Sequence, residues 1–564
     1  MNKIQVYQNY IQIIASSTDI PFLSLIDQVK GIEKQRARDT YRCSIHLLPE
    51  VLKILRGIED SSNLQSPIKE YYEEEMLRRR MTAELLQNGP NEEYAGLWNH
   101  QNLGVCLAKY NRRFNFFYDT RTGKTRMSYQ IMLNALKAGK AKRCLVVAPA
   151  TIIPDWLSDA EQFPELKVVA YYKNEKQKLQ ALTTPSHIVL WSLGTFVDNL
   201  ELLKKIKFDM VIFDESSKLK NHRSATAKAA LELSETVPSW YNLSATPAPN
   251  GEHEYYIQMR CVDPYCFNSA RTHFVNKYFI NMSRDSRYEK LRLNPVMYDE
   301  FMQKIKEHSI FVDQSVMPMA DKVWKVVEYD MSAATAEIYK QMASDAAIQL
   351  ADDTTITAEQ AASIRAKLSQ ITSGFVLDSD AIKRNIVSRK LGEAEDAREV
   401  YQVGDLERLR VLQTTLEFIH RNDSDASVII WANYAEEFAM LKGLLGSDAR
   451  VIRGGTSTAA REDIIAGFRA KQFRYLLAHP LSVGMGVNLT VAHWAVYYSI
   501  NDSWEALKQS SERICGHITI QPHTCRYLVL AARGSVNQIV YENVINKRDD
   551  SLALLEHVKA VALR

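Results

Sequence analysis

Two short stretches of this chain hold residue types that nucleotide chemistry needs. Residues 118–125 end in Gly-Lys-Thr, which is typical of a loop whose backbone amides and lysine hold phosphates. Its last residue, Thr125, offers the hydroxyl that such loops present to Mg2+. Residues 211–215 read Val-Ile-Phe-Asp-Glu and place two carboxylates at the end of an apolar run. Asp214 can hold the metal ion while Glu215 orients and deprotonates the attacking water. We therefore expect the chain to bind ATP with Mg2+.

The expected phosphate-binding residues are Thr122, Gly123, Lys124 and Thr125, and the expected Mg2+ ligands are Thr125 and Asp214. Arg121 stands where such loops more usually have glycine. That position often needs a positive φ, which a large side chain adopts only at a cost. We expect Arg121 to be tolerated, either near phosphate or in an ion pair with a surface carboxylate.

Short apolar runs alternate with helical stretches around these motifs. Alternation of this kind favours parallel sheets covered by helices, so we expect an α/β protein with two such lobes. The first series of expected strands is 144–148, 187–191, 210–213 and 240–243. The second series is 323–329, 427–431, 475–478, 495–498 and 526–530.

The distribution of strand-like and helical residue patterns divides the chain into four parts. Residues 1–90 lack strand-like apolar runs, and we expect an N-terminal helical accessory domain there. Residues 91–265 form the expected first lobe, 266–321 an insertion or linker between lobes, and 322–564 the second lobe. In the N-terminal part, Glu74 and Glu75 precede Arg78 and Arg79 by four residues. The run 78–80 could contact phosphates, but a solvated helix face with ion pairs is the interpretation we prefer.

Composition narrows the class of protein. The chain has 564 residues, of which 46% are hydrophobic, so it can build ordinary packed cores. The net charge of +3, from 70 basic and 67 acidic residues, does not by itself indicate a nucleic-acid partner. The seven cysteines form no Cys-x-x-Cys, and neither a secretion leader nor a membrane-spanning run is visible. We expect no membrane partner and a reducing cytoplasm, in a prokaryotic or phage-infected cell.

Further motifs follow one another in a fixed order along both expected lobes. Residues 97–101 read Leu-Trp-Asn-His-Gln, 214–221 Asp-Glu-Ser-Ser-Lys-Leu-Lys-Asn and 244–250 Ser-Ala-Thr-Pro-Ala-Pro-Asn. In the second lobe, 453–456 read Arg-Gly-Gly-Thr and 482–490 Ser-Val-Gly-Met-Gly-Val-Asn-Leu-Thr. This ordered set resembles the superfamily-two helicases, and within them the Swi/Snf-type motor of chromatin remodellers and their bacterial and viral relatives. The resemblance implies two RecA-like lobes with ATP and Mg2+ as cofactors.

The resemblance also implies roles for individual residues. Gln101 matches the adenine-reading glutamine, and Gly486 lies in a loop where backbone approaches a ligand. Gln509 and Arg513 match the catalytic motif of the second lobe, in which Arg513 would stabilise charge on the nucleotide held by the first. The positions that match nucleic-acid contact or coupling are Thr151, Ser192, Lys220, Asn221, Ser244, Thr246, Arg453, Thr456, Asn488 and Thr490.

Two further positions depart from the family's pattern. Ser217 replaces a histidine that in relatives links the hydrolytic site to the second lobe. Gly516 stands where a second arginine belongs, three residues after Arg513. An arginine finger contributes about 10³–10⁵ in rate in related phosphoryl transfers, so hydrolysis could be slow, rest on Arg513 alone or depend on His517. We hypothesise that Gly516→Arg raises turnover.

Several alternatives remain open from the sequence. Four ligands close to Gly516 could in principle bind zinc, namely Cys515, His517, His523 and Cys525. The motif variants favour double-stranded DNA as the track, with RNA less favoured. The chain could instead be a hydrolysis-impaired, nucleotide-gated protein that binds nucleic acid or a polymerase, or a strand-separating DNA or RNA helicase. Residues 1–90 could bind a protein partner such as a polymerase or repair complex.

Overall fold

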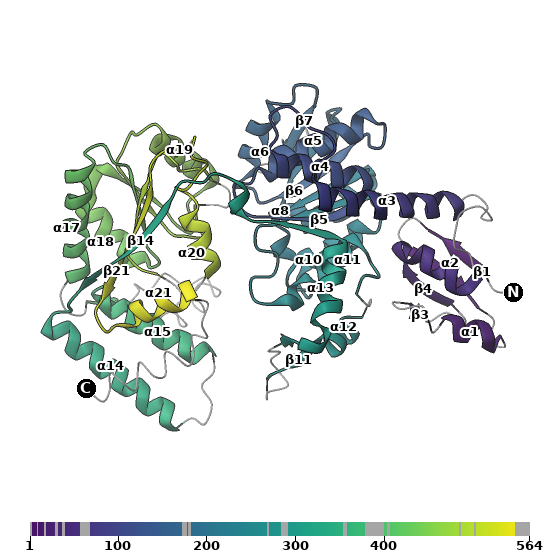
Figure 1. The fold of residues 1–564 in the computed structure, drawn as a ribbon. Helices are drawn as coiled ribbons and strands as arrows, with labels where there is room; N and C mark the ends of the chain where they lie inside the picture. Colours follow the sequence, from purple (N-terminus) through teal and green to yellow (C-terminus); the bar gives the residue numbers. More distant parts are fainter. Residues whose placement is uncertain are drawn as a thin grey trace. The chain divides into compact units, whose positions relative to one another are not determined.

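The computed structural model describes most of the chain in detail (Figure 1). The described residues are 3–7, 10–15, 19–26, 28, 32–35, 40–56, 68–171, 177–178, 182–267, 270–283, 291–352, 358–377, 400–402, 406–483, 487–500, 504–519 and 521–546. The chain forms two compact units, Met1–Met317 and Pro318–Arg564.

The first unit begins with an antiparallel sheet of four strands in the order β1-β2-β4-β3. These strands are β1 (Lys3–Val6), β2 (Tyr10–Ile14), β3 (Glu33–Lys34) and β4 (Thr40–Ser44), and helices α1 (Ile20–Ile26), α2 (Leu48–Arg56) and α3 (Ile68–Asn88) accompany them. We expected helices alone in residues 1–90, so the sheet is a correction. Its inward residues, such as Ile11 and Ile13, alternate with polar ones, and a search for continuous apolar runs misses that pattern.

The ion pairs expected on the long helix α3 are present only in part. Arg79 Nε lies 2.8 Å from Glu75 Oε1, four residues earlier, as expected. Glu74 pairs with Arg112 at 2.9 Å instead of with Arg78, which contacts Glu75 at 2.8 Å. Glu75 is 5% exposed, so this helix face is packed against other elements and is not simply solvated.

The first lobe is built on a seven-stranded sheet with the order β13-β5-β10-β9-β6-β8-β7, and every pairing in it is parallel. The strands are β5 (Arg113–Tyr118), β6 (Cys144–Ala148), β7 (Val168–Tyr171), β8 (Ile188–Ser192), β9 (Met210–Asp214), β10 (Ser239–Leu243) and β13 (Ser309–Val312). Their runs read as continuously apolar because helices cover both faces of a parallel sheet.

The helices of this lobe are α4 (Asn99–Tyr110), α5 (Lys124–Lys137), α6 (Ile153–Ala160), α8 (Leu193–Phe196), α9 (Leu200–Ile206), α10 (Ala225–Ser234), α11 (Tyr255–Val262), α12 (Arg271–Tyr278) and α13 (Tyr298–Glu307). Short 3₁₀ turns are η1 (Ile45–Leu47), η2 (Val197–Asn199), η3 (Ser216–Leu219), η4 (Glu252–Glu254), η5 (Pro295–Met297) and η6 (Gln314–Val316). Strands β11 (Phe279–Asn281) and β12 (Leu291–Leu293) form an antiparallel pair.

The segment 266–321, expected as a linker between lobes, belongs largely to the first lobe. Strand β13 extends the parallel sheet beside β5, and Phe301 and Ile305 of α13 lie in the same core cluster as Trp240. The strand is short and follows a polar stretch, which is why the sequence did not reveal it.

The second unit contains a six-stranded parallel sheet in the order β14-β21-β20-β17-β19-β18. Its strands are β14 (Lys322–Tyr329), β17 (Val428–Trp431), β18 (Ala449–Ile452), β19 (Tyr475–Ala478), β20 (Trp494–Tyr497) and β21 (Cys525–Ala532). Its helices are α14 (Ala333–Asp352), α15 (Ala358–Thr372), α17 (Glu407–Asn422), α18 (Ala435–Leu445), α19 (Thr458–Arg469), α20 (Trp504–Ser511) and α21 (Val536–Asn546), with the 3₁₀ turn η7 (Gly446–Asp448). An antiparallel pair, β15 (Phe375–Leu377) and β16 (Val400–Gln402), completes the unit.

Alternate residues of β17 enter different cores in this unit. Val428 and Ile430 pack with α17 and α18, whereas Ile429 and Trp431 pack on the opposite face. The sheet is therefore covered on both faces, as expected for an α/β lobe. Two parallel sheets, each covered by helices, confirm the predicted fold class.

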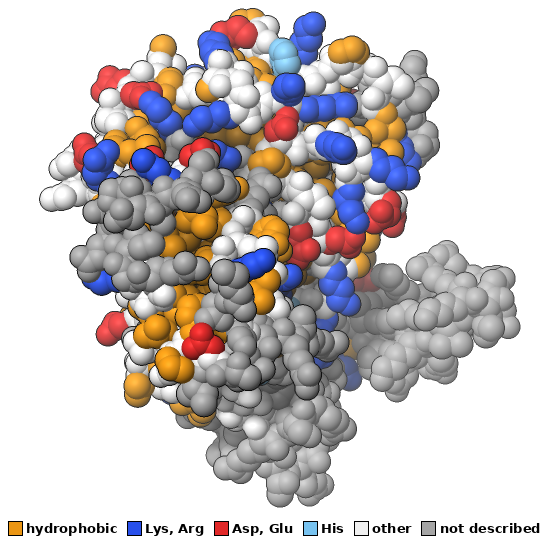
Figure 2. All heavy atoms as spheres, turned by 90° about the vertical axis from the view of Figure 1, so that its right-hand side faces the viewer, with side chains coloured by type: hydrophobic (Ala, Val, Ile, Leu, Met, Phe, Trp, Pro, Cys, Tyr) orange, Lys and Arg blue, Asp and Glu red, His pale blue; other side chains and the backbone are white. Residues whose placement is uncertain are grey.

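The surface is mixed in charge. On the face shown in Figure 2, Lys and Arg side chains lie among Asp and Glu side chains and apolar ones. Among the described residues, no helix combines the length and the hydropathy that crossing a bilayer requires.

Candidate nucleotide-binding site

The loop between β5 and α5 ends in a glycine at the start of a helix. Gly123 precedes α5 with φ +74°, and a Cβ added there would lie 1.9 Å from Gln101 Nε2. A residue with a Cβ would be strained at this φ and would have to displace the Gln101 amide. The first amides of the 14-residue helix α5 have no partner within the helix, and its N-terminus favours an anion.

Arg121 has a backbone φ of +61°, in the left-handed region. The sequence suggested this because glycine is more usual at this place in the loop. A residue with a Cβ is strained there by about 1–3 kcal/mol, so the rest of the loop must hold it in place.

Two residues of α4 contact the loop from behind. Gln101 Nε2 donates to the carbonyls of Thr122 and Gly123 at 3.2 and 2.9 Å, while its Oε1 accepts from the Trp98 amide at 2.8 Å. His100 Nε2 lies 2.8 Å from the Thr122 carbonyl, and burial lowers the pKa of this ring. The role of Gln101 as adenine ligand stays a prediction, and base recognition would require exchange of one of these bonds. His100 carries no motif signal, so the sequence did not identify it.

Lys124 lies folded against its own loop. Its Nζ donates to the Tyr118 and Asp119 carbonyls at 2.8 and 3.0 Å. Thr122 Oγ1 also donates to the Asp119 carbonyl, at 2.7 Å. A phosphate would offer the ammonium a charged acceptor, and charge-assisted hydrogen bonds are about twice as strong as neutral ones.

Asp214, at the end of β9, is 5% exposed. Burial raises the pKa of its carboxyl, whereas the Lys124 charge and a hydrogen bond from Trp156 oppose that rise. Trp156 Nε1 donates to Asp214 Oδ2 at 3.0 Å, and the Glu215 amide donates to Oδ1 at 2.9 Å. Lys124 and Trp156 thus both act on the Asp214 carboxyl, with Trp156 as an orienting donor.

Glu215 has a left-handed backbone, with φ +55°, and stands half-buried beside Asp214. Two buried serines follow it. Ser216 Oγ donates to Gln258 Oε1 at 2.7 Å, whereas Ser217 Oγ has no hydrogen-bond partner among the described residues. The coupling role considered for position 217 stays a prediction.

Gln258 of α11 joins two motifs that are separate in the sequence. Besides accepting from Ser216, it donates through Nε2 to the Pro247 carbonyl at 2.7 Å. Ser244 is buried, and its Oγ accepts from the Thr246 amide at 3.2 Å. The strand-end carboxylates and the Thr-Pro motif are thus linked through one amide side chain, which has no motif signal of its own.

The remaining predicted residues of the first lobe lie at strand ends or on the surface. Ser192 ends β8 beside Ala148, and its Oγ accepts from the Gly194 amide at 3.3 Å. Thr151 is half-buried just after β6. Lys220 is half-buried and Asn221 exposed, with Asn221 Oδ1 accepting from the Arg223 amide at 3.0 Å.

In the second unit, the Arg-Gly-Gly-Thr motif forms a small turn. The Arg453 amide donates to Thr456 Oγ1 at 3.1 Å, and Arg461 Nη2 donates to the Thr456 carbonyl at 3.2 Å. The Arg453 side chain is exposed. Its guanidinium is therefore accessible to a ligand in solution.

The last two motifs contact each other. The Leu489 amide donates to the Arg513 carbonyl at 2.9 Å, and Asn488 Oδ1 accepts from the Thr490 amide at 2.9 Å. Gln521, 1% exposed, donates to the carbonyls of Thr490, Ala492 and Ile514 at 2.8–3.0 Å. The sequence did not identify Gln521 because a lone glutamine carries no pattern.

The residues of the last catalytic motif are largely buried: Arg513 is 7% exposed, and Gln509 lies half-buried in α20. Gly516 is buried, and its carbonyl accepts from the Ala320 amide at 2.9 Å. Gly486 lies outside the described residues. The roles assigned to these residues stay predictions.

The Cys/His cluster near Gly516 is not assembled as a metal site. Cys515 Sγ donates to the Ala320 carbonyl and Cys525 Sγ to the Ile514 carbonyl, both at 3.4 Å. His517 Nδ1 lies 2.7 Å from Thr519 Oγ1, and His523 stacks on His493. Within the described part of the chain, the group of metal-ligand type is a different one, His46, Asp263 and His308.

The donors of the first unit fit a nucleotide triphosphate with Mg2+. Such a ligand requires a helix N-terminus, a glycine in the loop before it, and an ammonium whose charge acts on a buried carboxylate, and all three are present. Thr125 and Asp214 would hold the metal, which when bound screens phosphate charge.

Comparison with known proteins agrees with this chemistry. Residues 22–374 match the model of the SNF2-related domain, and residues 407–515 match that of the helicase conserved C-terminal domain. An uncharacterised ATP-dependent helicase of Mycoplasma genitalium is 22% identical over 433 residues, 74% of this chain and 38% of its own length. The DNA repair and recombination protein RAD54B of Mus musculus is 20% identical over 446 residues, 74% of this chain and 50% of its own.

Protein p41 of Acyrthosiphon pisum secondary endosymbiont phage 1 is 22% identical over 477 residues, 79% of this chain and 95% of its own length. The chain thus spans half or less of the mouse and Mycoplasma proteins but nearly all of the phage protein. The matches to a Swi/Snf-type ATPase confirm the family predicted from the motifs.

Proposed function

Because the chain belongs to the SNF2-related family of helicase-like ATPases, we propose that it is an ATP-dependent translocase on double-stranded DNA. One observation carries the proposal. Lys124 and Asp214 come from distant parts of the sequence, yet they interact electrostatically within one unit, beside a helix N-terminus. This is the arrangement that ATP with Mg2+ requires.

The proposed chemistry assigns one task to each group. Lys124 binds the β- and γ-phosphates, Thr125 and Asp214 hold the metal, and Glu215 takes the proton of the attacking water. Arg513 and Gln509 of the second unit act on the same nucleotide, as the family's order of motifs implies. Trp156 is a positioning residue because it acts through Asp214.

Duplex DNA is the proposed track. The Lys-Leu-Lys-Asn and Thr-Pro-x-x-Asn variants resemble those of translocases on intact duplexes, and the mouse relative is named for DNA repair and recombination. Lys218 and Arg453 are exposed cations in the matching motifs and would contact phosphates without reading sequence. Binding should then weaken steeply with salt.

Steady-state ATP hydrolysis by the purified chain tests this proposal, measured without nucleic acid and with duplex DNA, single-stranded DNA or RNA. Lys124→Ala should abolish turnover. Lys137→Ala is the matched control and should retain normal turnover. Lys137 lies at the far end of the same helix, in an exposed ion pair with Glu165. Stimulation by duplex DNA above that by the other polymers supports the proposal, whereas stimulation by RNA alone refutes it.

A second candidate is a nucleotide-gated binding protein with little hydrolysis. Two observations favour it: glycine occupies position 516, and Ser217 has no polar partner in the described structure. Tight binding of a fluorescent ATP analogue with no turnover in any condition would select this candidate. Gly516→Arg should then raise turnover, provided that the variant unfolds at the same temperature as the parent, because Gly516 is buried.

A further inference from the structure

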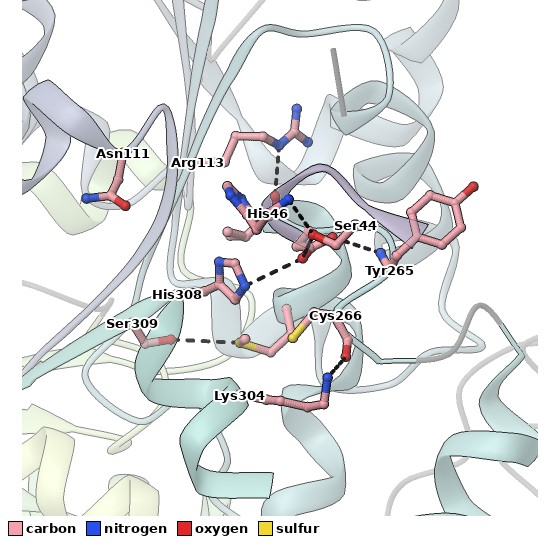
Figure 3. Close-up of polar contacts among 12 residues, drawn as sticks. Ser44, His46, Asn111, Arg113, Tyr265, Cys266, Lys304, His308 and Ser309 are labelled. Atoms are coloured by element: carbon pink, nitrogen blue, oxygen red, sulfur yellow. Dashed lines mark hydrogen bonds and ion pairs between the residues drawn. The ribbon is translucent and has the colours of Figure 1, made fainter. Parts of the chain in front are cut away.

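Three potential metal ligands meet where the N-terminal sheet contacts the first lobe. His46 lies in η1, and Asp263 and His308 are the residues that follow α11 and α13. One ligand atom from each lies within 4.8 Å of the others. Figure 3 shows Ser44, His46 and His308 near one another. Ser44 Oγ and His308 Nε2 lie 2.6 and 3.5 Å from Asp263 Oδ2. None of these residues belongs to the nucleotide site.

We propose that His46, Asp263 and His308 form a Zn2+ site that fastens the N-terminal domain to the first lobe. Two imidazoles and a carboxylate are ligands that zinc accepts, with Zn–N and Zn–O distances of about 2.0–2.2 Å. A water or the Ser44 hydroxyl would complete four-fold coordination.

The distances are close to what such a site needs. Tetrahedral zinc with those bond lengths sets its ligand atoms about 3.4 Å apart. His308 Nε2 and Asp263 Oδ2 already lie 3.5 Å apart. One ligand atom of the half-exposed His46 lies within 4.8 Å of the other two, so a small shift of this side chain would complete the set.

The groups behind the ligands are those that orient metal-binding side chains. Glu75 Oε2 lies 2.8 Å from His46 Nδ1, which leaves Nε2 as the nitrogen that can ligate. A carboxylate that accepts from the other ring nitrogen is the usual partner of a metal-bound histidine. Arg78 Nε and Arg79 Nε donate to the two carboxylate oxygens of Glu75, each at 2.8 Å, and fix its orientation toward His46.

Asp263 is oriented in the same way. Ser44 Oγ donates to its Oδ2 at 2.6 Å, and the Tyr265 amide donates to its Oδ1 at 2.9 Å. Its side chain is 3% exposed and that of His308 is 5% exposed, so the ligands sit in a water-poor setting. A cavity of about 260 Å³, lined by His46, Glu75 and Asp263 among others, provides a route of entry.

The metal content of the full chain, purified without chelator, tests the proposal by elemental analysis. Wild type should retain about one Zn2+ per chain, and after stripping it should bind Co2+ with visible absorption bands. His46→Gln keeps a side chain that can donate to Glu75 and should lose most of the metal. Glu75→Gln should weaken Co2+ binding by about 10–100-fold, the usual effect of altering such a partner.

His517→Gln is the matched control, since it removes a histidine of the other Cys/His cluster, and it should leave metal content unchanged. Thermal unfolding with and without EDTA adds a readout independent of ATP hydrolysis, because EDTA should lower the midpoint of wild type but not of His46→Gln. Wild type without zinc, full zinc in His46→Gln, or loss of zinc in His517→Gln would each overturn the proposal.

Discussion

The indole Nε1 of Trp156 donates a hydrogen bond of 3.0 Å to Oδ2 of Asp214, the carboxylate proposed to hold Mg2+. Trp156 is 1% exposed, and its ring packs on Tyr129 with a centroid distance of 5.4 Å. The bond favours the ionised carboxylate, while burial raises its pKa. The tryptophan of the helix after β6 therefore opposes protonation of a residue 58 positions later.

Trp156→Phe should move the acid limb of the pH profile of ATP hydrolysis to higher pH. Without the indole donor the pKa of Asp214 rises further, so the carboxyl is protonated at a pH where wild type is ionised. A hydrogen bond to a charged group contributes about 1.5–3 kcal/mol, so the limb should move by about one pH unit or more. The measurement is kcat/KM against pH.

Trp191→Phe is the control for that profile. Trp191 is also fully buried in the first lobe, but its Nε1 has no hydrogen-bond partner in the described structure. The acid limb of the kcat/KM profile of Trp191→Phe should coincide with that of wild type. Equal profiles for all three proteins would contradict a role for Trp156 in the ionisation of Asp214.

Arg121→Gly should stabilise the chain relative to Arg121→Ala. Both variants lose the guanidinium, but only glycine adopts the φ of +61° without strain. The difference in free energy of unfolding should be about 1 kcal/mol in favour of glycine. Urea unfolding measures it, and an alanine variant as stable as the glycine variant would show that the loop is unstrained.

Ser216→Ala and Ser217→Ala are neighbouring, equally small changes with different expected costs. Loss of the Ser216 hydroxyl leaves Gln258 Oε1 without its donor in a buried site and should cost about 1–3 kcal/mol of unfolding free energy. Ser217 Oγ has no hydrogen-bond partner in the described structure, so Ser217→Ala should be close to neutral. Calorimetry of both variants compares the costs, and the reverse ranking would refute the assignment of partners.

Arg408→Met should be among the most destabilising single changes in the second unit. Arg408 and Glu437 are 1% and 0% exposed and lie 3.9 Å apart, and Arg408 Nη1 also donates to Ser373 Oγ at 2.6 Å. Removing the cation leaves a buried carboxylate without its counter-charge, at a cost of about 3–5 kcal/mol. Arg410→Met, on the exposed face of the same helix, should cost little. Chemical unfolding of the two variants distinguishes a buried network from a general effect of losing arginine.

The strands of both lobes were predictable because parallel strands buried on two faces read as unbroken apolar runs. Residues 144–148 and 475–478 coincide with β6 and β19. The N-terminal sheet was missed because buried apolar residues alternate with polar ones along its strands. Strand β13 was missed because it has only four residues and follows a polar segment.

The candidate site residues that the sequence alone offers are those whose chemistry is local. Gly-Lys-Thr and Asp-Glu are contiguous, and Arg121 drew attention because the loop geometry favours glycine. Gln258 and Gln521 were not predictable, because each is a lone amide whose partners lie in distant segments. The cluster of His46, Asp263 and His308 was hidden for the same reason, since 262 residues separate its ends.

Displacement of a third strand from a triple helix, placed on an otherwise intact duplex, tests whether the chain moves along duplex DNA. The account predicts ATP-dependent displacement by wild type and by Lys137→Ala, none by Lys124→Ala, and no separation of the underlying duplex. Hydrolysis stimulated by duplex DNA without displacement, or displacement that persists in Lys124→Ala, would contradict a translocase powered by the site around Lys124 and Asp214.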